Sequence, residues 1–271
     1  MIKLEDKYKI ALTSSIAASR MIMEVYKRDV KPSIKKDGSP VTKADLASSK
    51  IIKNALSETN IPITGEELIK TPYNERKKWE YLWCVDPLDG TKEFLKKNGE
   101  FVVNIALIQN QKPVFGIIAS PVAERVIIGG SAIDGAYYLS FEHINNTEKW
   151  EPLNHLDKIN NPPVVISSRS HYSGDLLELI KNIENSYGKI ASAQMGSALK
   201  FFELVKGKAD VYPRFAPTME WDIAAGQAIY EVIGGEIISL KSRKPLIYNK
   251  KDLRNNFFVA RKKIMDFKVS E

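Results

Sequence analysis

A change of hydrophobic periodicity along the chain constrains the fold more than any other feature of the sequence. Between residues 81 and 139, short runs of β-forming residues follow one another, and turn-rich links such as residues 109–113 separate them. Strands that succeed one another through short links form an antiparallel meander, because parallel neighbours need a long crossover. The predicted strands cover residues 81–85, 101–109, 114–120, 125–129 and 135–139.

Helical periodicity dominates both sides of this meander. Apolar residues at steps of three and four from Leu4 to Val25 predict a long amphipathic helix that ends before Pro32. Thr42 and Asp45 have capping-box spacing and predict the start of a second helix. In the last part of the chain strands and helices alternate. Strands are expected at 164–167, 190–191, 209–212, 236–239 and 257–260, and helices at 175–183, 197–206 and 222–233.

The order of these elements indicates a mixed α+β chain in two parts. Residues 1–155 are expected to form an α+β domain that holds the antiparallel sheet, and residues 156–271 an α/β domain. The boundary follows from Pro- and Asn-rich sequence around residues 152–163, where the composition changes. A chain of 271 residues buries enough apolar surface to need no disulfide or structural metal.

Composition excludes several classes of protein. The single cysteine, Cys84, rules out an intramolecular disulfide and a cysteine-based zinc site, and it fits a reducing compartment. No apolar run approaches the roughly 18 residues of a membrane-spanning helix, and acids near the N-terminus are unlike a signal peptide, so we expect a cytoplasmic protein. The net charge is +7, but the lysines are scattered and often stand beside acids, which favours a solvated basic surface over nucleic-acid binding.

The segment with the clearest chemistry is Asp86-Pro87-Leu88-Asp89-Gly90-Thr91. An apolar strand runs into two carboxylates three residues apart, Pro87 restricts the backbone between them, and Gly90 leaves room for the chain to turn. A strand end that presents two acids and then exposed amides can hold a hard cation and a phosphate together. An acidic turn without function is the alternative, but the ordered combination favours a metal-dependent phosphate site.

Two further acidic motifs strengthen this interpretation. Gly65-Glu66-Glu67 follows a short apolar stretch, and Trp221-Asp222 opens the last predicted helix. Each has an ordinary explanation by itself, the first as a solvated loop and the second as a first-turn acid favoured by the helix dipole. Together with Asp86 and Asp89 they favour one site of oxygen ligands, which select Mg²⁺ or Mn²⁺ over softer metals.

These three motifs, in this order, resemble those of the inositol monophosphatase superfamily of magnesium-dependent, lithium-sensitive phosphatases. The segments 37–45, 92–94, 196–201 and 209–214 further resemble the CysQ branch of 3′(2′),5′-bisphosphate nucleotidases. The similarity extends over essentially the whole chain. It implies a layered αβαβα sandwich of the inositol monophosphatase or sugar phosphatase type, with an antiparallel sheet in the first half and a smaller α/β second half.

The resemblance also implies a two-metal site. One Mg²⁺ would be held by Glu66, Asp86, Asp89 and the carbonyl oxygen of Leu88. A second would be held by Asp86, Asp89 and Asp222, and Mn²⁺ can substitute for either ion. Glu66 would also reach a third ion through water. Four carboxylates and two Mg²⁺ carry equal and opposite charge, so the loaded site is neutral before a phosphate enters.

The same resemblance identifies water as the nucleophile. Thr91 and Asp45 would orient and deprotonate this water, with Glu66 as a third catalytic group. Asp45 equally fits the acid of the capping box, and one side chain could serve both roles. Because an Asp of ordinary pKa is a weak base, the metals must supply most of the acidification of the water. A covalent aspartyl-phosphate mechanism is excluded because it needs an Asp-x-Asp motif.

For the substrate, the resemblance implies that the amides of Gly90 and Thr91 cradle the scissile phosphate. The other predicted substrate-binding residues are His171, Ser197, Lys200, Arg214, Asp222 and, beside the ribose, Glu220. By its sequence position alone, Lys200 would be a solvated lysine on a helix.

We therefore predict an Mg²⁺-dependent phosphomonoesterase that removes the 3′-phosphate of adenosine 3′,5′-bisphosphate and gives AMP and phosphate. By family analogy it would clear a by-product of sulfate activation in sulfur assimilation. An inositol monophosphatase or fructose-1,6-bisphosphatase on the same metal site is the alternative among enzymes, and a basic nucleic-acid-binding module is the alternative outside them. We expect a nucleotide as the partner, no nucleic acid, a monomer or homodimer, and at most peripheral contact with a membrane.

Overall fold

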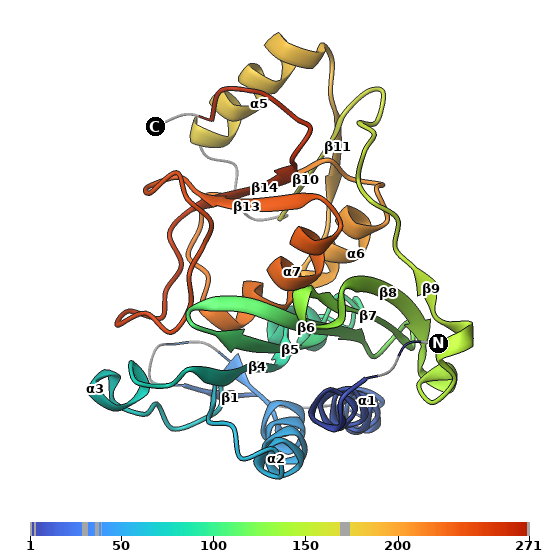
Figure 1. Ribbon diagram of the computed structural model, residues 1–271, viewed down its shortest axis with the longest axis vertical. Coiled ribbons are helices and arrows are strands. Elements are labelled where there is room, and N and C mark those ends of the chain that lie inside the picture. The colour runs from blue at the N-terminus through green and yellow to red at the C-terminus, as the bar shows by residue number, and fades with distance from the viewer. Residues whose placement is uncertain are drawn as a thin grey trace.

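The computed structural model describes residues 2, 4–28, 32–35, 38, 40–168 and 174–269. Five layers follow one another from one end of the molecule to the other (Figure 1). Helices α1 (Asp6–Tyr26) and α2 (Lys43–Ser57) form the first layer, and a seven-stranded sheet forms the second. Helices α6 (Lys200–Val205) and α7 (Glu220–Val232), a five-stranded sheet and helix α5 (Gly174–Tyr187) complete the stack. The predicted αβαβα sandwich is confirmed.

The seven-stranded sheet is the predicted meander with one strand added at each side. Its order is β3-β4-β5-β6-β7-β8-β9, and every neighbouring pair is antiparallel except β3 and β4. The strands are β3 (Ile63–Gly65), β4 (Tyr81–Asp89), β5 (Val102–Gln109), β6 (Lys112–Ser120), β7 (Arg125–Gly130), β8 (Gly135–Ser140) and β9 (Glu151–Pro152). Strand β4 is longer than predicted, so the two acids of the aspartate motif lie on the strand itself.

The five-stranded sheet has the order β11-β10-β12-β14-β13. Strand β10 is parallel to β11 and β12, whereas β14 is antiparallel to β12 and β13. The strands are β10 (Val164–Ser167), β11 (Ala191–Gln194), β12 (Val211–Arg214), β13 (Gly235–Ser239) and β14 (Phe258–Lys262). The remaining short elements are β1 (Ser33–Ile34), β2 (Pro40–Val41), α3 (Tyr73–Arg76), α4 (Thr91–Leu95) and the 3-10 turns Ser131–Ile133, Phe141–His143, Thr147–Lys149 and Ser197–Leu199.

Helix α2 begins where the capping box predicts. The Thr42 hydroxyl accepts a hydrogen bond from the Ala44 amide at 3.1 Å, and the Asp45 carboxylate accepts one from the Thr42 amide at 2.7 Å. These two bonds satisfy amides that the first helical turn leaves without partners. They also hold the Asp45 side chain at a defined place on the face of α2 that packs against β4.

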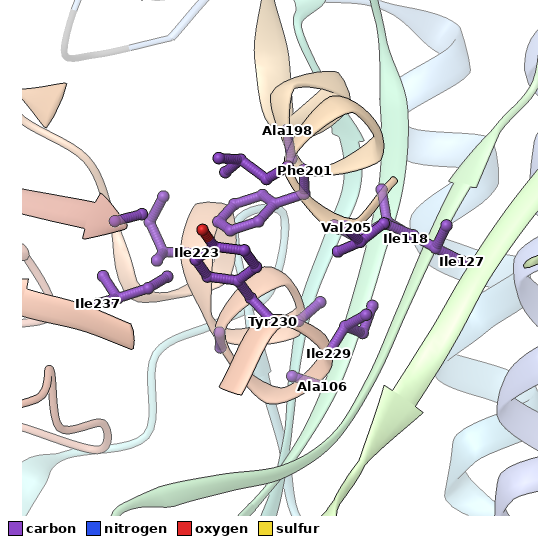
Figure 2. Packing of buried hydrophobic residues seen from close by; sticks show 14 of the residues in the cluster. Ala106, Ile118, Ile127, Ala198, Phe201, Val205, Ile223, Ile229, Tyr230 and Ile237 are labelled. Carbon is purple, nitrogen blue, oxygen red and sulfur yellow. The ribbon is translucent and has the colours of Figure 1, made fainter. Parts of the chain in front are cut away.

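Helix α7 joins the two sheets into one core. A Cβ atom at Gly116 of β6 would lie 2.2 Å from the Ala225 carbonyl oxygen, so α7 can approach the large sheet only at a glycine. Figure 2 shows Phe201 and Tyr230 between Ile118 of the large sheet and Ile237 of the small one.

The predicted boundary at 155/156 falls between the two sheets, but the helices of the second part cover the first sheet. No helix in the described ranges is long and apolar enough to cross a membrane.

Candidate active site

The aspartate motif lies where β4 ends and α4 begins. Asp86 is buried, and its Oδ1 accepts a hydrogen bond from the Leu88 amide at 3.0 Å. The pairing of β4 with β5 shifts in register between Asp86 and Asp89, because Pro87 has no amide hydrogen to donate. Gly90 then adopts a left-handed φ of 101°, and a Cβ there would lie 2.8 Å from the Glu100 carbonyl oxygen. The turn after the two acids therefore requires glycine.

Four carboxylates from three segments surround this turn and influence one another electrostatically. Asp86 and Asp89 come from β4, Glu66 follows the parallel neighbour β3, and Asp222 lies in the first turn of α7. Burial raises the pKa of Asp86 well above its ordinary value, and the charges of the other three carboxylates raise it further. Burial and then the charge of Asp89 likewise raise the pKa of Asp222 well above its ordinary value. Without a bound cation, the four negative charges thus disfavour one another in addition to the cost of their burial.

Each of these carboxylates bonds to a different partner. Asp89 Oδ2 accepts from the Ala198 amide at 2.6 Å, and Asp222 Oδ2 accepts from the Met219 amide at 2.9 Å. Glu66 accepts from the Lys35 ammonium at 2.7 Å, and the same ammonium also bonds to Glu67. Within residues 40–168, 174–269 and the shorter described ranges, no three His, Cys, Asp or Glu side chains already converge to hold a metal ion.

The donor set nevertheless fits a hard divalent cation. Burial raises the pKa of Asp89 to about 6, whereas the Ala198 amide and then the Lys200 charge lower it. Burial is the main cause of the raised carboxylate pKa values and the neighbouring carboxylates add to it, and a divalent cation offsets both effects. Carboxylate oxygens are the ligands that Mg²⁺ and Mn²⁺ prefer.

Asp45 and Thr91 are in direct contact, although they are 46 residues apart in sequence. The Thr91 hydroxyl donates to Asp45 Oδ1 at 2.9 Å, while Asp45 Oδ2 accepts from the Thr42 amide and hydroxyl. Burial raises the pKa of Asp45, and the bonds from Thr42 and then Thr91 lower it. The capping role is therefore present, and it leaves the second carboxylate oxygen for Thr91.

A cleft of about 260 Å³ extends from Asp89 and Asp222 toward the small sheet. It brings together six of the predicted residues: Asp89, Gly90, Ser197, Lys200, Arg214 and Asp222. Ser197 packs on the turn of the aspartate motif, because its Cβ would lie 3.2 Å from a Cβ at Gly90. The second half of the chain thus supplies most of the lining, and the aspartate motif together with residues 92–100 supplies the rest.

The two predicted cations of this cleft have different environments. Arg214 Nη1 donates to the Ser168 hydroxyl at 2.6 Å and Nη2 to the Pro217 carbonyl at 3.4 Å, whereas its buried Nε has no partner among the described residues. Lys200 is buried rather than solvated, and its ammonium donates to the carbonyls of Ser197 and Met195 at 2.6 and 3.1 Å. Burial lowers the pKa of Lys200 to about 8.

Two other predicted substrate-binding residues in the described part of the chain, Thr91 and Glu220, do not line this cleft. Glu220 is fully buried, and its carboxylate bonds to the backbone amides of Asn249 and Lys250. His171 lies outside the described residues.

Sequence reasoning did not identify Lys35, Ser168 or the Ala198 amide. Ser168 follows β10 at the carboxyl end of a parallel pair, where ligand-binding residues gather, so its position was a usable signal. Lys35 and Ala198 carried no such signal. Their partners, Glu66 and Asp89, are 31 and 109 residues away in sequence.

Comparison with known proteins agrees with this geometry. The model of the inositol monophosphatase family matches residues 3–265. The 3′(2′),5′-bisphosphate nucleotidase CysQ of Escherichia coli K12 is 36% identical over 239 residues, which cover 87% of this chain and 91% of the relative. The protein of the same name from Salmonella typhimurium is 38% identical over 224 residues, covering 81% and 85%.

Solved structures agree with the fold. The crystal structure of CysQ from Bacteroides thetaiotaomicron has a TM-score of 0.81 at 38% identity, and the alignment covers 94% of this chain and 97% of that one. Inositol monophosphatase II from Staphylococcus aureus has a TM-score of 0.73 at 22% identity, covering 94% and 90%. The latter similarity concerns the fold alone.

Proposed function

The chain belongs to the inositol monophosphatase family, and we propose that it is a 3′(2′),5′-bisphosphate nucleotidase that converts adenosine 3′,5′-bisphosphate to AMP and phosphate. The observation that carries this proposal is one cleft that joins Asp89 and Asp222 to the Arg214 guanidinium. The acidic end can hold cations against a scissile phosphate, and the basic end can bind a second phosphate. Such an activity would clear the bisphosphate by-product of sulfate activation.

The relatives support this substrate over the alternatives. Proteins that share more than a third of their residues with this chain carry the nucleotidase name, whereas the inositol monophosphatase from Staphylococcus aureus shares 22%. Arg214 Nε, which is buried and has no partner among the described residues, also fits an anion that an inositol monophosphate lacks. We therefore do not favour an inositol or fructose-bisphosphate phosphatase.

The acidic end of the cleft is the place for the metals. We propose that Glu66, Asp86, Asp89 and the Leu88 carbonyl hold one Mg²⁺, and that a second is shared with Asp222. When bound, these cations lower the pKa of a neighbouring water and stabilise the charge that develops on the phosphoryl oxygens. The protein itself contributes a buried set of ligands on β4 and α7, two elements that pack in one core.

Thr91 and Asp45 form the proton-accepting pair. Because the Thr91 hydroxyl donates its hydrogen to Asp45 Oδ1, the lone pairs of Thr91 Oγ1 face outward and can accept a hydrogen bond from the attacking water. As the water attacks phosphorus, the bond from phosphorus to the ribose 3′-oxygen breaks; the proton of the water passes to Thr91 Oγ1, and the Thr91 hydrogen passes to Asp45 Oδ1. The 3′-oxygen leaves with the bonding electron pair and takes up a proton from solvent water, which gives the 3′-hydroxyl of AMP. Burial raises the pKa of Asp45, and a raised pKa makes this carboxylate a better base at neutral pH than an ordinary Asp.

The other groups of the cleft orient the nucleotide. Gly90 lines the cleft, and we propose that its backbone amide and that of Thr91 donate to the scissile phosphate. Arg214 offers Nε and its planar fork to the 5′-phosphate, and its bond to Ser168 holds that fork in place. Both phosphates of the substrate then have donors on the chain.

A phosphate-release assay tests the proposed function. The panel consists of adenosine 3′,5′-bisphosphate, inositol 1-phosphate and fructose 1,6-bisphosphate, each with Mg²⁺ and with EDTA. We expect release that depends on Mg²⁺ and a kcat/KM for the nucleotide that exceeds the other two. A preference for inositol 1-phosphate would overturn the substrate, and release in EDTA would overturn the metal site.

A further inference from the structure

Glu220 is a fully buried acid one turn from the metal-binding end of the cleft, and it does not face that cleft. It is the first residue of α7, and Asp222 is the third. Successive helical residues are rotated by about 100°, so these two side chains leave the helix about 200° apart. Asp222 lines the cleft, and Glu220 therefore points to the opposite side of the first turn.

On that side Glu220 meets the loop between β13 and β14. Its Oε2 accepts from the Asn249 amide at 2.6 Å, and its Oε1 accepts from the Lys250 amide at 3.0 Å. The Lys250 ammonium donates to the same Oε1 at 2.7 Å. The Glu220 amide in turn donates to the Leu253 carbonyl at 3.0 Å. Both carboxylate oxygens and the backbone of this residue are thus committed to one loop.

The loop is itself attached to the first half of the chain. Asn249 adopts a left-handed φ of 59°, and its side chain exchanges hydrogen bonds with Arg76. Arg76 Nη1 donates to Asn249 Oδ1 at 2.8 Å, and Asn249 Nδ2 donates to the Arg76 carbonyl at 2.7 Å. Arg76 lies in α3, between β3 and β4, the strands that supply Glu66 and the aspartate motif.

The start of α7 is therefore tied to the segment that carries the other metal ligands. We propose that Glu220 is a positioning residue: its bonds to residues 249–250 fix the first turn of α7 and so place Asp222 to hold a divalent cation. This inference rests on the proposed function, because it presumes the metal site. It assigns Glu220 a role at the metal and not at the ribose.

Glu220→Gln tests the inference. A glutamine keeps the shape but has one acceptor and one donor, so either the Asn249 amide or the Lys250 groups would face an NH₂ group. We expect the dissociation constant for Mn²⁺, measured by calorimetry on the nucleotide-free protein, to rise about 10- to 100-fold, as is usual for residues that support metal ligands. The KM for nucleotide at saturating metal should change by less than about threefold.

Asp210→Asn is the matched control. Asp210 and Lys262 form another buried ion pair in the second half of the chain, at 2.6 Å, and neither residue lines the cleft. This variant should lower the Tm and leave Mn²⁺ binding unchanged. If both variants weaken Mn²⁺ binding equally, the effect is a general loss of stability and the inference is overturned.

The remaining outcomes separate the alternatives. Unchanged Mn²⁺ binding in Glu220→Gln overturns the inference, and a raised KM for nucleotide with unchanged Mn²⁺ binding assigns Glu220 to the substrate. Absence of Mn²⁺ binding in the unmodified protein overturns the proposed metal site, and the inference with it.

If Glu220→Gln does not fold, Glu220→Met combined with Lys250→Met replaces the pair by apolar side chains, which buried sites often tolerate. Normal Mn²⁺ binding by that double variant would overturn the inference, and weakened binding would support it.

Discussion

Arg214 should decide how strongly the enzyme distinguishes a bisphosphate from a monophosphate. A dianionic 5′-phosphate that leaves water needs charged donors, and Arg214 is the cleft residue with a buried nitrogen that has no partner among the described residues. Its Nη1 is held at 2.6 Å by Ser168, so the guanidinium is already fixed before substrate arrives. Arg214→Ala removes these donors, while the acidic end of the cleft keeps its residues.

The magnitude follows from the kind of contact that is lost. A charge-assisted hydrogen bond contributes about 1.5–3 kcal/mol net, which corresponds to a factor of about 10 to 200 in kcat/KM. We expect a loss of that size for adenosine 3′,5′-bisphosphate. Hydrolysis of 3′-AMP, which has no second phosphate, should fall by less than about threefold. Arg214→Lys keeps the charge but loses the fork, so its loss on the bisphosphate should be intermediate.

Steady-state kinetics on both substrates, with a thermal melt of each variant, provide the assay. Arg261→Ala is a suitable control, because Arg261 pairs with Glu236 on the small sheet and does not line the cleft. It should leave the ratio of the two kcat/KM values unchanged. Equal losses on both substrates in Arg214→Ala would refute the reasoning, since Arg214 would then support the fold or the metal site.

Four further predictions concern the acidic end of the cleft. Asp222→Asn should abolish nearly all turnover and reduce the increase in Tm on adding Mg²⁺. It should also raise the Tm of the metal-free protein, because it removes a buried, repelled charge. An unchanged effect of Mg²⁺ on the Tm would contradict this prediction. Burial raises the pKa of Asp89 from 3.8 to about 6 in the folded protein, so the folded protein keeps a proton that the unfolded chain releases. The free energy of unfolding of the metal-free protein should therefore fall as the pH rises from 3.8 to about 6, and urea unfolding at several pH values measures this. Thr91→Val should lower kcat by about 100-fold or more with little change in KM, because it interrupts the route of the proton to Asp45; equal changes in both constants would argue for a role in binding. Li⁺, which is similar in size to Mg²⁺ but carries half its charge, should inhibit at concentrations at which K⁺ does not, and equal inhibition curves for the two salts would remove this expectation.

Features that depend on neighbours in sequence were predictable from the sequence. The meander followed from alternation and short turns, because consecutive antiparallel strands pair through local links. The start of α2 followed from Thr42 and Asp45, since a capping box is complete within four residues. The aspartate motif was also local, although β4 runs four residues further than its apolar character indicates, because strand pairing with β5 continues past Asp86.

Features that depend on the direction of a side chain were decided only by the tertiary structure. Each residue of a helix is rotated by about 100° from the one before, so acids two residues apart, such as Glu220 and Asp222, lie on opposite sides of α7. Burial changed the environment of Lys200, whose ammonium bonds to backbone carbonyls where sequence position alone suggested solvent. The meeting of Arg214 with the aspartate motif required both sheets to pack on the same helices. No local pattern encodes such a contact, because its free energy comes from a core that residues far apart in the chain build together.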